Sequence, residues 1–271
     1  MTSSVDTAFS GSVAQFYERY MVPLIFEPYA VDLARRVAQA APGRVLELAA
    51  GTGVVTRQLA VMLPVASEIV ATDLNPAMIE EAARIGTERS VEWRQADAMK
   101  LPFGDGSFDA VACQFGVMFF PDRPQAYAEA RRVLRAGGFF AFNAWGAIAM
   151  NEFADAVTDA LATVFPNDPP RFMARTPHGY HDAARIAQDL AAAGFTRTPA
   201  IETVAFTSRA VTPRIAALAY CQGTPLRGEI EARDPGGLER ATQAAEAELA
   251  RRFGEGPIEG RIEALVVTVT S

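Results

Sequence analysis

The sequence predicts an α/β protein built on a doubly wound, mostly parallel β-sheet. Three observations favour this class: short apolar runs alternate with helical patterns, a glycine-containing turn follows the first run, and an acidic residue ends the second. Of the 271 residues, 50% are hydrophobic and 21% are charged, which is typical of a folded core and not of a disordered chain. The length allows one large domain or two small ones.

The first half of the chain supplies the alternating pattern. Its apolar runs are nearly continuous, as in parallel strands that helices cover on both faces. The expected strands are 44–49, 68–73, 91–95, 108–114 and 137–143. The expected helices are 54–63, 76–85 and 123–134, with Asn75 and Asp122 as N-caps of the last two and the glycines of 136–138 as the stop signal.

The second half has longer helical stretches and two further strands. The proline-rich run 166–170 is expected to end a helix, and 238–253 has the acidic, alanine-rich composition of a surface helix. The expected helices are 152–165, 181–193, 213–222 and 238–253, and the expected strands are 201–207 and 261–270. We find no internal repeat.

Charge and cysteine usage exclude several classes of function. The chain has 32 acidic and 25 basic residues, and its only lysine, Lys100, lies among scattered arginines, so we expect no nucleic-acid partner. Cys113 and Cys221 are 108 positions apart, which does not suggest a disulfide framework. No basic targeting segment and no run of roughly 20 apolar residues is present, so we expect a cytoplasmic protein without a membrane span. We also expect no metal site.

The turn after the first strand is the most informative motif. Gly51 and Gly53 would let a ligand approach backbone N–H groups at a helix N-terminus, although a tight turn without a ligand is the alternative. Asp73 follows Gly51 by 22 positions, close to the spacing at which an acid binds ribose hydroxyls. Asp73 could instead cap a helix, but Asn75 is better placed for that, which leaves Asp73 for the sugar.

A dinucleotide site is one candidate for this turn. It would have a third glycine where this chain has Thr56, and a short-chain dehydrogenase would have a tyrosine four residues before Lys100, where Ala96 lies. Because both residues are absent, an NAD(P)-dependent oxidoreductase loses most of its support and is kept only as an alternative, as is a cofactor-binding module without catalysis.

Four ordered segments resemble the class I S-adenosylmethionine-dependent methyltransferases, particularly the ubiquinone/menaquinone type. They are VLELAAGTG at 45–53, ATDLNPAMIE at 71–80, QADAMKLPFGDGSFDAVACQFGVMFFPD at 95–122 and RVLRAGGFFAFNAW at 132–145. The resemblance implies a Rossmann-like, seven-stranded core with strand order 3-2-1-4-5-7-6 in a single domain, 1–271. It divides the chain into an N-terminal lid (1–40), a cofactor-binding half (41–145), two helical cap insertions (146–178 and 208–258) and a last strand (259–271).

The resemblance also implies a cofactor, S-adenosyl-L-methionine, with S-adenosyl-L-homocysteine as product. Glu47 would face the methionine moiety, Asp73 would bind the ribose, and Asp97 would bind the adenine amine. The backbone carbonyl of Gln114 would accept from the methionine amino group, and Leu74 would pack on adenine. The expected cofactor-binding residues are Tyr20, Glu47, Ala49, Gly51, Thr52, Gly53, Asp73, Leu74, Met78, Asp97, Ala98, Met99, Gln114 and Phe115.

The expected reaction is an SN2 methyl transfer to a small, partly apolar metabolite. Such a transfer chiefly needs alignment in a dry pocket, so a general base is optional. Many relatives have histidines where this chain has Met118 and Phe119, which points to an apolar acceptor site. The weak candidates for a base are Tyr20, His178 and His181, and for the histidines a solvent-exposed position at a helix start is the favoured alternative. A homodimer is compatible with the sequence, which does not specify the acceptor.

The segment 14–36 before the first strand is rich in aromatic residues. By the resemblance it would close over the cofactor as a lid; the alternative is an amphipathic helix packed on the sheet. Pro23 and Pro28 interrupt the segment and its helical periodicity is poor, which favours the lid.

Overall fold

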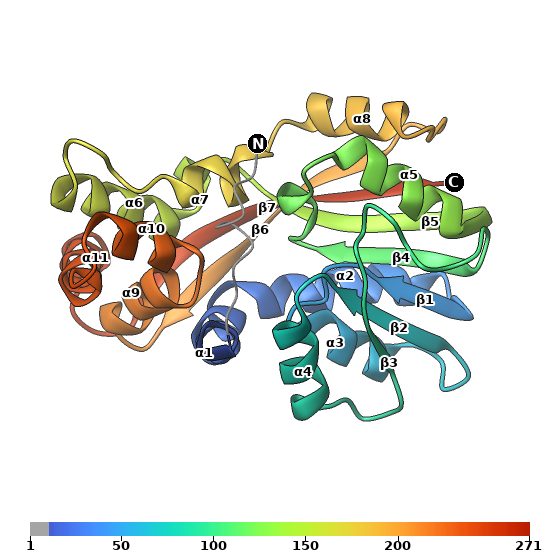
Figure 1. Ribbon diagram of the computed structural model, residues 1–271, viewed down its shortest axis with the longest axis horizontal. Coiled ribbons are helices and arrows are strands. Elements are labelled where there is room, and N and C mark those ends of the chain that lie inside the picture. The colour runs from blue at the N-terminus through green and yellow to red at the C-terminus, as the bar shows by residue number, and fades with distance from the viewer. Residues whose placement is uncertain (1–10) are drawn as a thin grey trace. The chain divides into compact units, whose positions relative to one another are not determined.

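The computed structural model describes residues 11–271 and contains a seven-stranded sheet of order β3-β2-β1-β4-β5-β7-β6 (Figure 1). All pairings from β3 to β5 are parallel. The α/β class and the strand order that the resemblance implies are therefore confirmed. The strands are β1 Arg44–Glu47, β2 Glu68–Asp73, β3 Glu92–Gln95, β4 Phe108–Gln114, β5 Leu134–Trp145, β6 Ala200–Ala210 and β7 Ile258–Thr270.

The chain divides into two compact units. Unit 1 contains the residues up to Phe26 together with Trp145–Gly179 and Ala205–Glu263, and unit 2 contains Glu27–Ala144, Tyr180–Val204 and Ala264–Ser271. Strands β6 and β7 each contribute residues to both. The predicted insertions 146–178 and 208–258 lie within unit 1; their role as a cap stays a prediction, as do the other predicted boundaries.

Unit 2 covers both faces of the sheet with helices. On one face Tyr127 of α5 packs against Phe140 and Phe142 of β5, and α5 also contacts α8. The residues that alternate with these phenylalanines face the other side, where α2 and α3 pack together. Both predicted N-caps are confirmed, because Asn75 accepts from Ala77 N (3.0 Å) and Asp122 accepts from Gln125 N (3.0 Å). The helices are α2 Glu27–Gln39, α3 Val54–Met62, α4 Pro76–Ile85, η3 Val117–Phe119, α5 Arg123–Val133 and α8 Ala183–Ala192.

Strand β5 corrects one prediction about the glycines of 136–138. They do not stop helix α5, which ends at Val133; they lie inside β5, which begins at once with Leu134. The β4–β5 register shifts between Phe108 and Ala110, and a Cβ on Gly138 would come within 2.8 Å of the Asp109 carbonyl oxygen. Glycine is needed there because two backbones approach closely at a bulge.

The N-terminal segment is helical throughout, contrary to the expectation of a broken stretch. Pro23 lies inside the π-helix η2 Tyr17–Phe26, and Pro28 is the second residue of α2, which continues η2 without a break, so neither proline ends the helix. The buried residues of α2 recur with helical spacing: Tyr29, Ala30, Leu33, Ala34 and Val37. Residues 1–10 of the expected lid lie outside the described part of the chain, and closure of a lid stays a prediction.

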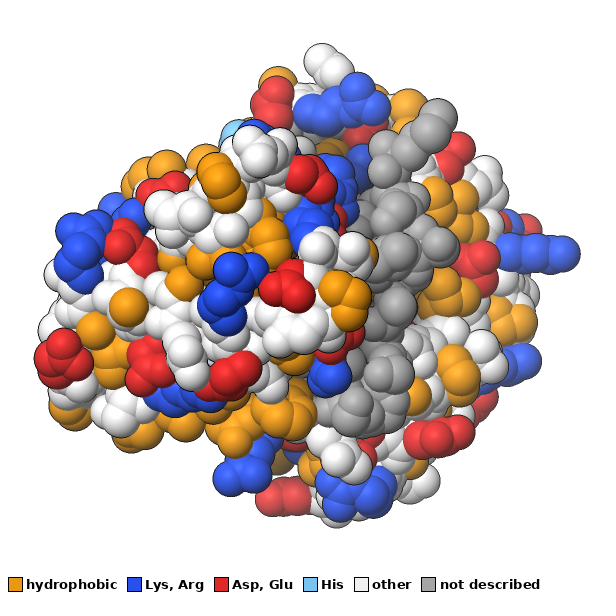
Figure 2. Space-filling model, turned by 60° about the vertical axis from the view of Figure 1, so that its left-hand side comes forward, with side chains coloured by type: hydrophobic (Ala, Val, Ile, Leu, Met, Phe, Trp, Pro, Cys, Tyr) orange, Lys and Arg blue, Asp and Glu red, His pale blue; other side chains and the backbone are white. Residues whose placement is uncertain are grey.

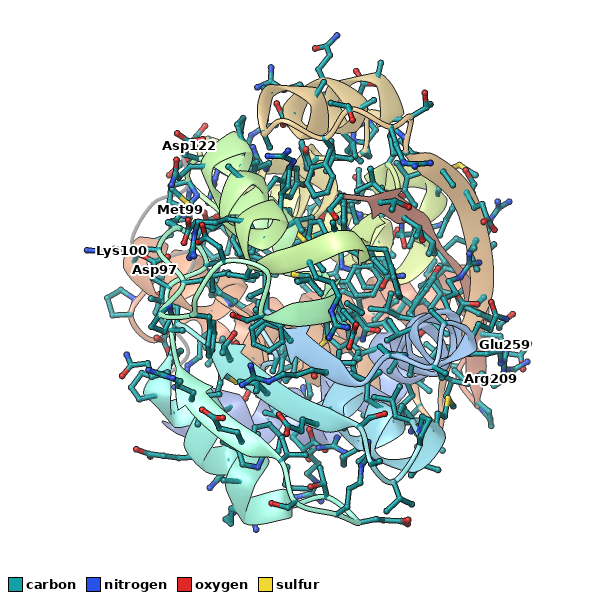
Figure 3. The ribbon with its side chains drawn as sticks, turned by 90° about the vertical axis from the view of Figure 1, so that its right-hand side faces the viewer. Asp97, Met99, Lys100, Asp122, Arg209 and Glu259 are labelled. Carbon is teal, nitrogen blue, oxygen red and sulfur yellow. The ribbon has the colours of Figure 1, made fainter. Side chains whose placement is uncertain are left out.

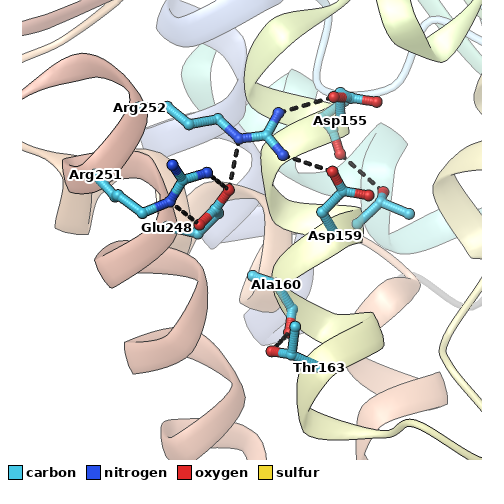
Figure 4. A network of polar contacts seen from close by, with 9 residues as sticks. Asp155, Asp159, Ala160, Thr163, Glu248, Arg251 and Arg252 are labelled. Atoms are coloured by element: carbon cyan, nitrogen blue, oxygen red, sulfur yellow. Dashed lines mark hydrogen bonds and ion pairs between the residues drawn. The ribbon is translucent and has the colours of Figure 1, made fainter.

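Unit 1 is mostly helical. Helix α11, expected at the surface, also buries one face against α6 and α9 through Ala241, Ala245 and Leu249. Arg252 of α11 bonds to Glu248 and to Asp155 and Asp159 of α6 (Figure 4). The helices are α1 Gly11–Phe16, η2, η4 Ile148–Met150, α6 Glu152–Val164, α7 Phe172–Arg175, η5 Pro177–Gly179, α9 Pro213–Gln222, α10 Leu226–Arg233 and α11 Leu238–Phe253. The sequence patterns missed the short helices α7 and α10.

Candidate functional site

The glycine turn follows β1, which ends at Glu47, two residues before the predicted end. Ala49 has φ 51°, unusual for a residue with a side chain, and Gly51 and Gly53 have φ 56° and 84°. A Cβ on Gly53 would come within 2.8 Å of the Trp93 indole, so only glycine fits there without rearrangement. No side chain caps the start of α3 after Gly53. The turn therefore directs the first amide groups of α3 toward the carboxyl edge of the sheet.

Asp73, at the end of β2, holds this turn in place. Its Oδ2 accepts from Gly51 N (2.9 Å) and its Oδ1 accepts from Asn75 N (2.8 Å). Asp73 is thus not free of partners as expected, because backbone N–H groups, including that of Leu74, bond to its carboxylate. Its binding of a ribose stays a prediction. Burial raises the pKa of Asp73, and these backbone N–H groups oppose the rise.

Glu47 lies beneath the turn with its side chain buried. Its Oε2 accepts from Thr56 Oγ1 at 2.6 Å, so Thr56, at the position of the third glycine of a dinucleotide motif, ties α3 to β1 through a hydrogen bond. Burial raises the pKa of Glu47 to about 8, while Thr56 and Arg57 act in the opposite direction. Burial therefore favours the neutral form of Glu47, which positions the turn through its bond with Thr56.

Thr52 provides the first test of whether a polar ligand fits the turn. It is 1% exposed, and its Oγ1 has no hydrogen-bond partner among the described residues. Buried hydroxyl groups are nearly always bonded. A turn that binds the polar end of a small molecule would contain such a hydroxyl, because the ligand supplies the missing hydrogen-bond partner.

The expected adenine-binding residues lie after β2 and β3. Asp97 is exposed and its Oδ1 accepts from Met99 N (2.9 Å); Asp97, Met99 and Lys100 lie near one another in Figure 3. Leu74 is 54% exposed, an unusual position for a large apolar side chain and a suitable one for an apolar contact with a ligand. Ala98 and Met78, in contrast, are buried, and Met78 packs within α4.

The loop after β4 approaches the glycine turn. Phe115 has φ 51°, a second strained non-glycine residue at this edge, and its N–H donates to Asn143 O (3.2 Å). A Cβ on Gly116 would collide with Ala49 Cβ and lie 2.8 Å from Cys113 Sγ. Gly116 is therefore needed because the loops after β1 and β4 touch where the order of the parallel strands reverses, which is where open α/β sheets bind ligands.

The carboxyl edge of β1–β5 thus brings most predicted residues together. Parallel register places Asp73 beside Gln95 and Gln114 beside Asn143, and each pair shares a face. The sequence patterns did not single out Asn143, the last residue of the expected strand 137–143. An isolated polar residue at the end of a buried strand was the signal that could have found it.

The role of the weak candidates for a base, Tyr20, His178 and His181, stays a prediction. Tyr20 and His178 belong to unit 1, and the ring of Tyr20 contacts that of Phe16 in a tilted arrangement, with 5.4 Å between the ring centroids. The favoured solvent-exposed position is wrong for His178, which is 4% exposed with Nδ1 2.9 Å from Gly146 O. His181 is exposed and precedes α8, which begins after the cap Asp182 and not at residue 181.

Comparisons with known proteins agree with this site. Residues 46–142 match the methyltransferase domain family. A demethylmenaquinone methyltransferase from Thermus thermophilus is 45% identical over 111 residues, which are 40% of this chain and 49% of that protein. The chain thus spans about half the length of this curated relative.

Solved structures match over more of the chain at lower identity. The YcgJ protein from Bacillus subtilis has a TM-score of 0.57 and 19% identity, covering 90% of this chain and 98% of its own. The [4+2]-cyclase SpnF has a TM-score of 0.50 and 18% identity, covering 89% of this chain and 79% of its own. These matches show the fold, which also serves an enzyme named for another reaction. The sequence match, the strand order and the glycine turn agree with one another: residues 46–142 are similar to the methyltransferase domain family, and the sheet has the strand order that this resemblance implies.

Proposed function

We propose that the chain transfers a methyl group from S-adenosylmethionine to a small, partly apolar metabolite. The observation that carries the proposal is the bond from Gly51 N to Asp73 Oδ2, which fixes the glycine turn against a carboxylate in a segment that matches the methyltransferase domain. The cofactor would supply a methyl group already activated by its sulfonium. What the chain must add is alignment and exclusion of water.

The residues that would hold the cofactor follow the edge of the sheet in order. Asp97 after β3 would accept from the adenine amine, and Asp73 after β2 would accept from the ribose hydroxyls. Thr52 and the first amides of α3 would bind the methionine carboxylate, and the carbonyl of Gln114 would accept from its amino group. Ala49, Gly51 and Gly53 supply the backbone shape, Leu74 and Met99 the apolar contacts, and Glu47 supports the turn from below.

The acceptor is proposed to be partly apolar. Val117 and Met118, after the loop of Phe115, are fully buried, which supports an apolar surrounding. Because the relative from Thermus thermophilus is named a demethylmenaquinone methyltransferase, an aromatic quinone-type compound is the first acceptor to test.

A small molecule is a better candidate than a nucleic acid. The face shown in Figure 2 has arginine side chains interspersed with acidic ones, and the whole chain has a net charge of −7. Residues 11–271 contain no helix both long and apolar enough to cross a bilayer. Homodimer formation stays a prediction.

Binding of S-adenosylhomocysteine tests the proposal. At 100 times its Kd it should stabilise the protein by about 2.7 kcal/mol, and NADH should not. Asp73→Ala should weaken binding by about 10- to 100-fold, because it removes a carboxylate from a partly buried hydrogen-bonded site, while Asp73→Asn, which keeps one acceptor oxygen, should lose less. The matched control is Asp159→Ala in unit 1, which removes a bond to Arg252 and should leave affinity unchanged.

Titration calorimetry and urea unfolding of each variant would separate lost affinity from lost folding. Transfer of a labelled methyl group to a naphthoquinol would then test the reaction. Stabilisation by NADH alone, or equal affinity in the Asp73 and Asp159 variants, would reject the proposed cofactor site.

A further inference from the structure

Asn143 is a buried polar side chain with no function in the fold. It is 0% exposed near the carboxyl end of β5, and neither its Nδ2 nor its Oδ1 has a hydrogen-bond partner among residues 11–271. Buried amides are almost always bonded, so a fully orphaned one requires an explanation. Either a group from outside the chain bonds to the amide, or the folded chain is destabilised by a buried polar group that bonds to nothing.

No neighbouring residue bonds to the side chain of Asn143 among residues 11–271. Register pairs it with Gln114 on the adjacent strand, about 5 Å away, and the two side chains share a face of the sheet. One step back on that face, the paired residues are Ala112 and Ala141, whose methyl groups neither donate nor accept. On this face of the sheet the amide of Asn143 therefore has Gln114 beside it and alanine methyl groups one step behind it.

The backbone of Asn143 does not explain the choice of asparagine either. Its carbonyl oxygen accepts from Phe115 N (3.2 Å), which holds the strained loop after β4. Any residue would offer that carbonyl. The side chain is thus a separate feature, beside Phe115, whose ring meets Tyr29 edge-on at 5.2 Å.

We propose that Asn143 binds an oxygen atom of the methyl acceptor, a hydroxyl or carbonyl carried by an apolar aromatic ring. This inference rests on the proposed function. The proposed cofactor residues follow β3, β2, β1 and β4, with the methionine end at Gln114, and Asn143 lies one strand farther along the same edge. The molecule beyond the methionine end is the acceptor.

The chemistry of the amide selects the group. It carries a donor and an acceptor and no charge, so it suits a neutral hydroxyl or carbonyl and offers a bound ion no opposite charge. The aromatic pair Phe115 and Tyr29 nearby suits a ring. Asn143 is therefore assigned as a positioning and specificity residue.

Two probes that differ in one oxygen test the assignment: 1-naphthol and 1-methylnaphthalene. Each would be titrated by calorimetry into protein saturated with S-adenosylhomocysteine. The natural protein should bind 1-naphthol at least about tenfold more tightly, because a site built to bond an oxygen rejects the analogue that lacks it. Asn143→Leu should reduce this preference to less than about twofold.

Two further readouts distinguish a ligand role from a structural one. Asn143→Leu should keep the affinity for S-adenosylhomocysteine and should not lower Tm, because it replaces an unbonded amide with an apolar group of similar size. The matched control is Asn151→Ala in unit 1, another buried asparagine, whose amide bonds to Ala147 O and Glu263 O. It should lower Tm and leave the preference for 1-naphthol intact.

Each other outcome has a definite meaning. The assignment is overturned if the natural protein binds neither probe or binds both equally. It is also overturned if Asn143→Leu lowers Tm and leaves the preference for 1-naphthol unchanged, because that result would indicate that an internal water bonds to the amide. Parallel loss of S-adenosylhomocysteine affinity would make Asn143 a cofactor residue and also overturn it. Failure of the proposed function appears earlier, as no binding of S-adenosylhomocysteine by the natural protein.

Discussion

Two glutamates, one in each unit, show opposite uses of a carboxyl group. Glu47 of unit 2 is 1% exposed beneath the glycine turn, where burial raises its pKa to about 8. Glu248 of unit 1 lies on α11, where bonds from Arg251 and Arg252 lower its pKa to about 2. The first region keeps polar groups buried and close to neutral, which suits ligand binding; the second neutralises charges against one another near the surface.

The largest expected effect is a pH dependence from Glu47. Its pKa is higher in the folded chain than in the unfolded one, so the folded state binds more protons between about pH 4.5 and 8. The free energy of unfolding should therefore fall as pH rises through this window, by up to roughly 5 kcal/mol from this group. Urea unfolding at pH 5 and pH 8.5 would measure the fall.

Glu47→Gln isolates this contribution. It keeps the size of the side chain and an oxygen that accepts from Thr56, but it cannot ionise. The variant should lose most of the decrease in stability between the two pH values. If the natural protein and the variant change equally, Glu47 is not the titrating group, and the contrast with Glu248 fails.

Gly116→Ala should have the next largest effect. The added Cβ would collide with Ala49 and press on Cys113, and overpacking of this kind costs about 1–3 kcal/mol. Gly236→Ala in unit 1 is the matched control, because a Cβ there meets nothing within 4 Å. Its free energy of unfolding should change by less than about 0.5 kcal/mol. Equal losses in the two variants would show that the loops after β1 and β4 are not in tight contact.

The smallest expected effect belongs to the arginine cluster of unit 1. Glu248→Gln should cost about 1 kcal/mol at pH 7, which is less than a pKa of about 2 would give by linkage alone, because solvent and salt screen ion pairs this close to the surface. The sign is opposite to that of Glu47. A lowered pKa gives stability that is present above pH 4.5 and is lost as pH falls toward 2. A loss of several kcal/mol at pH 7, or one insensitive to salt, would contradict this view of the cluster.

Local signals were sufficient to predict much of the cofactor edge. The turn through Gly51 and Gly53, the cap at Asn75 and the strand ending at Asp73 depend on neighbouring residues and on side-chain shape, which a sequence contains directly. The 22-residue separation of Gly51 and Asp73 also predicted that Asp73 lies near the turn. It did not show that Gly51 itself donates to Asp73, because that bond joins residues 22 positions apart.

The errors occurred where distant parts of the chain decide the local structure. Gly138 resembles a helix stop, but its function is set by the approach of Asp109 on β4. Pro23 resembles a helix breaker, but it lies in a π-helix whose residues 21, 22 and 24–26 are buried. His178 was expected at the surface and is buried against Gly146. For Asn143, the polar residue can be read from the sequence. That its side chain has no hydrogen-bond partner among residues 11–271 depends on how the neighbouring strands pack.

The position of β7 between β5 and β6 sets an order of events during synthesis. Strand β6 leaves the ribosome first, yet its place in the sheet requires β7, which follows after residues 211–257. At 5–20 residues per second that delay is about 2–9 s, far longer than collapse of a nascent chain. During this delay the backbone N–H and C=O groups of β6 that will pair with β7 are unpaired and can bond to other chains. A chaperone that shields extended segments should therefore raise the yield of this protein more than one that acts after release.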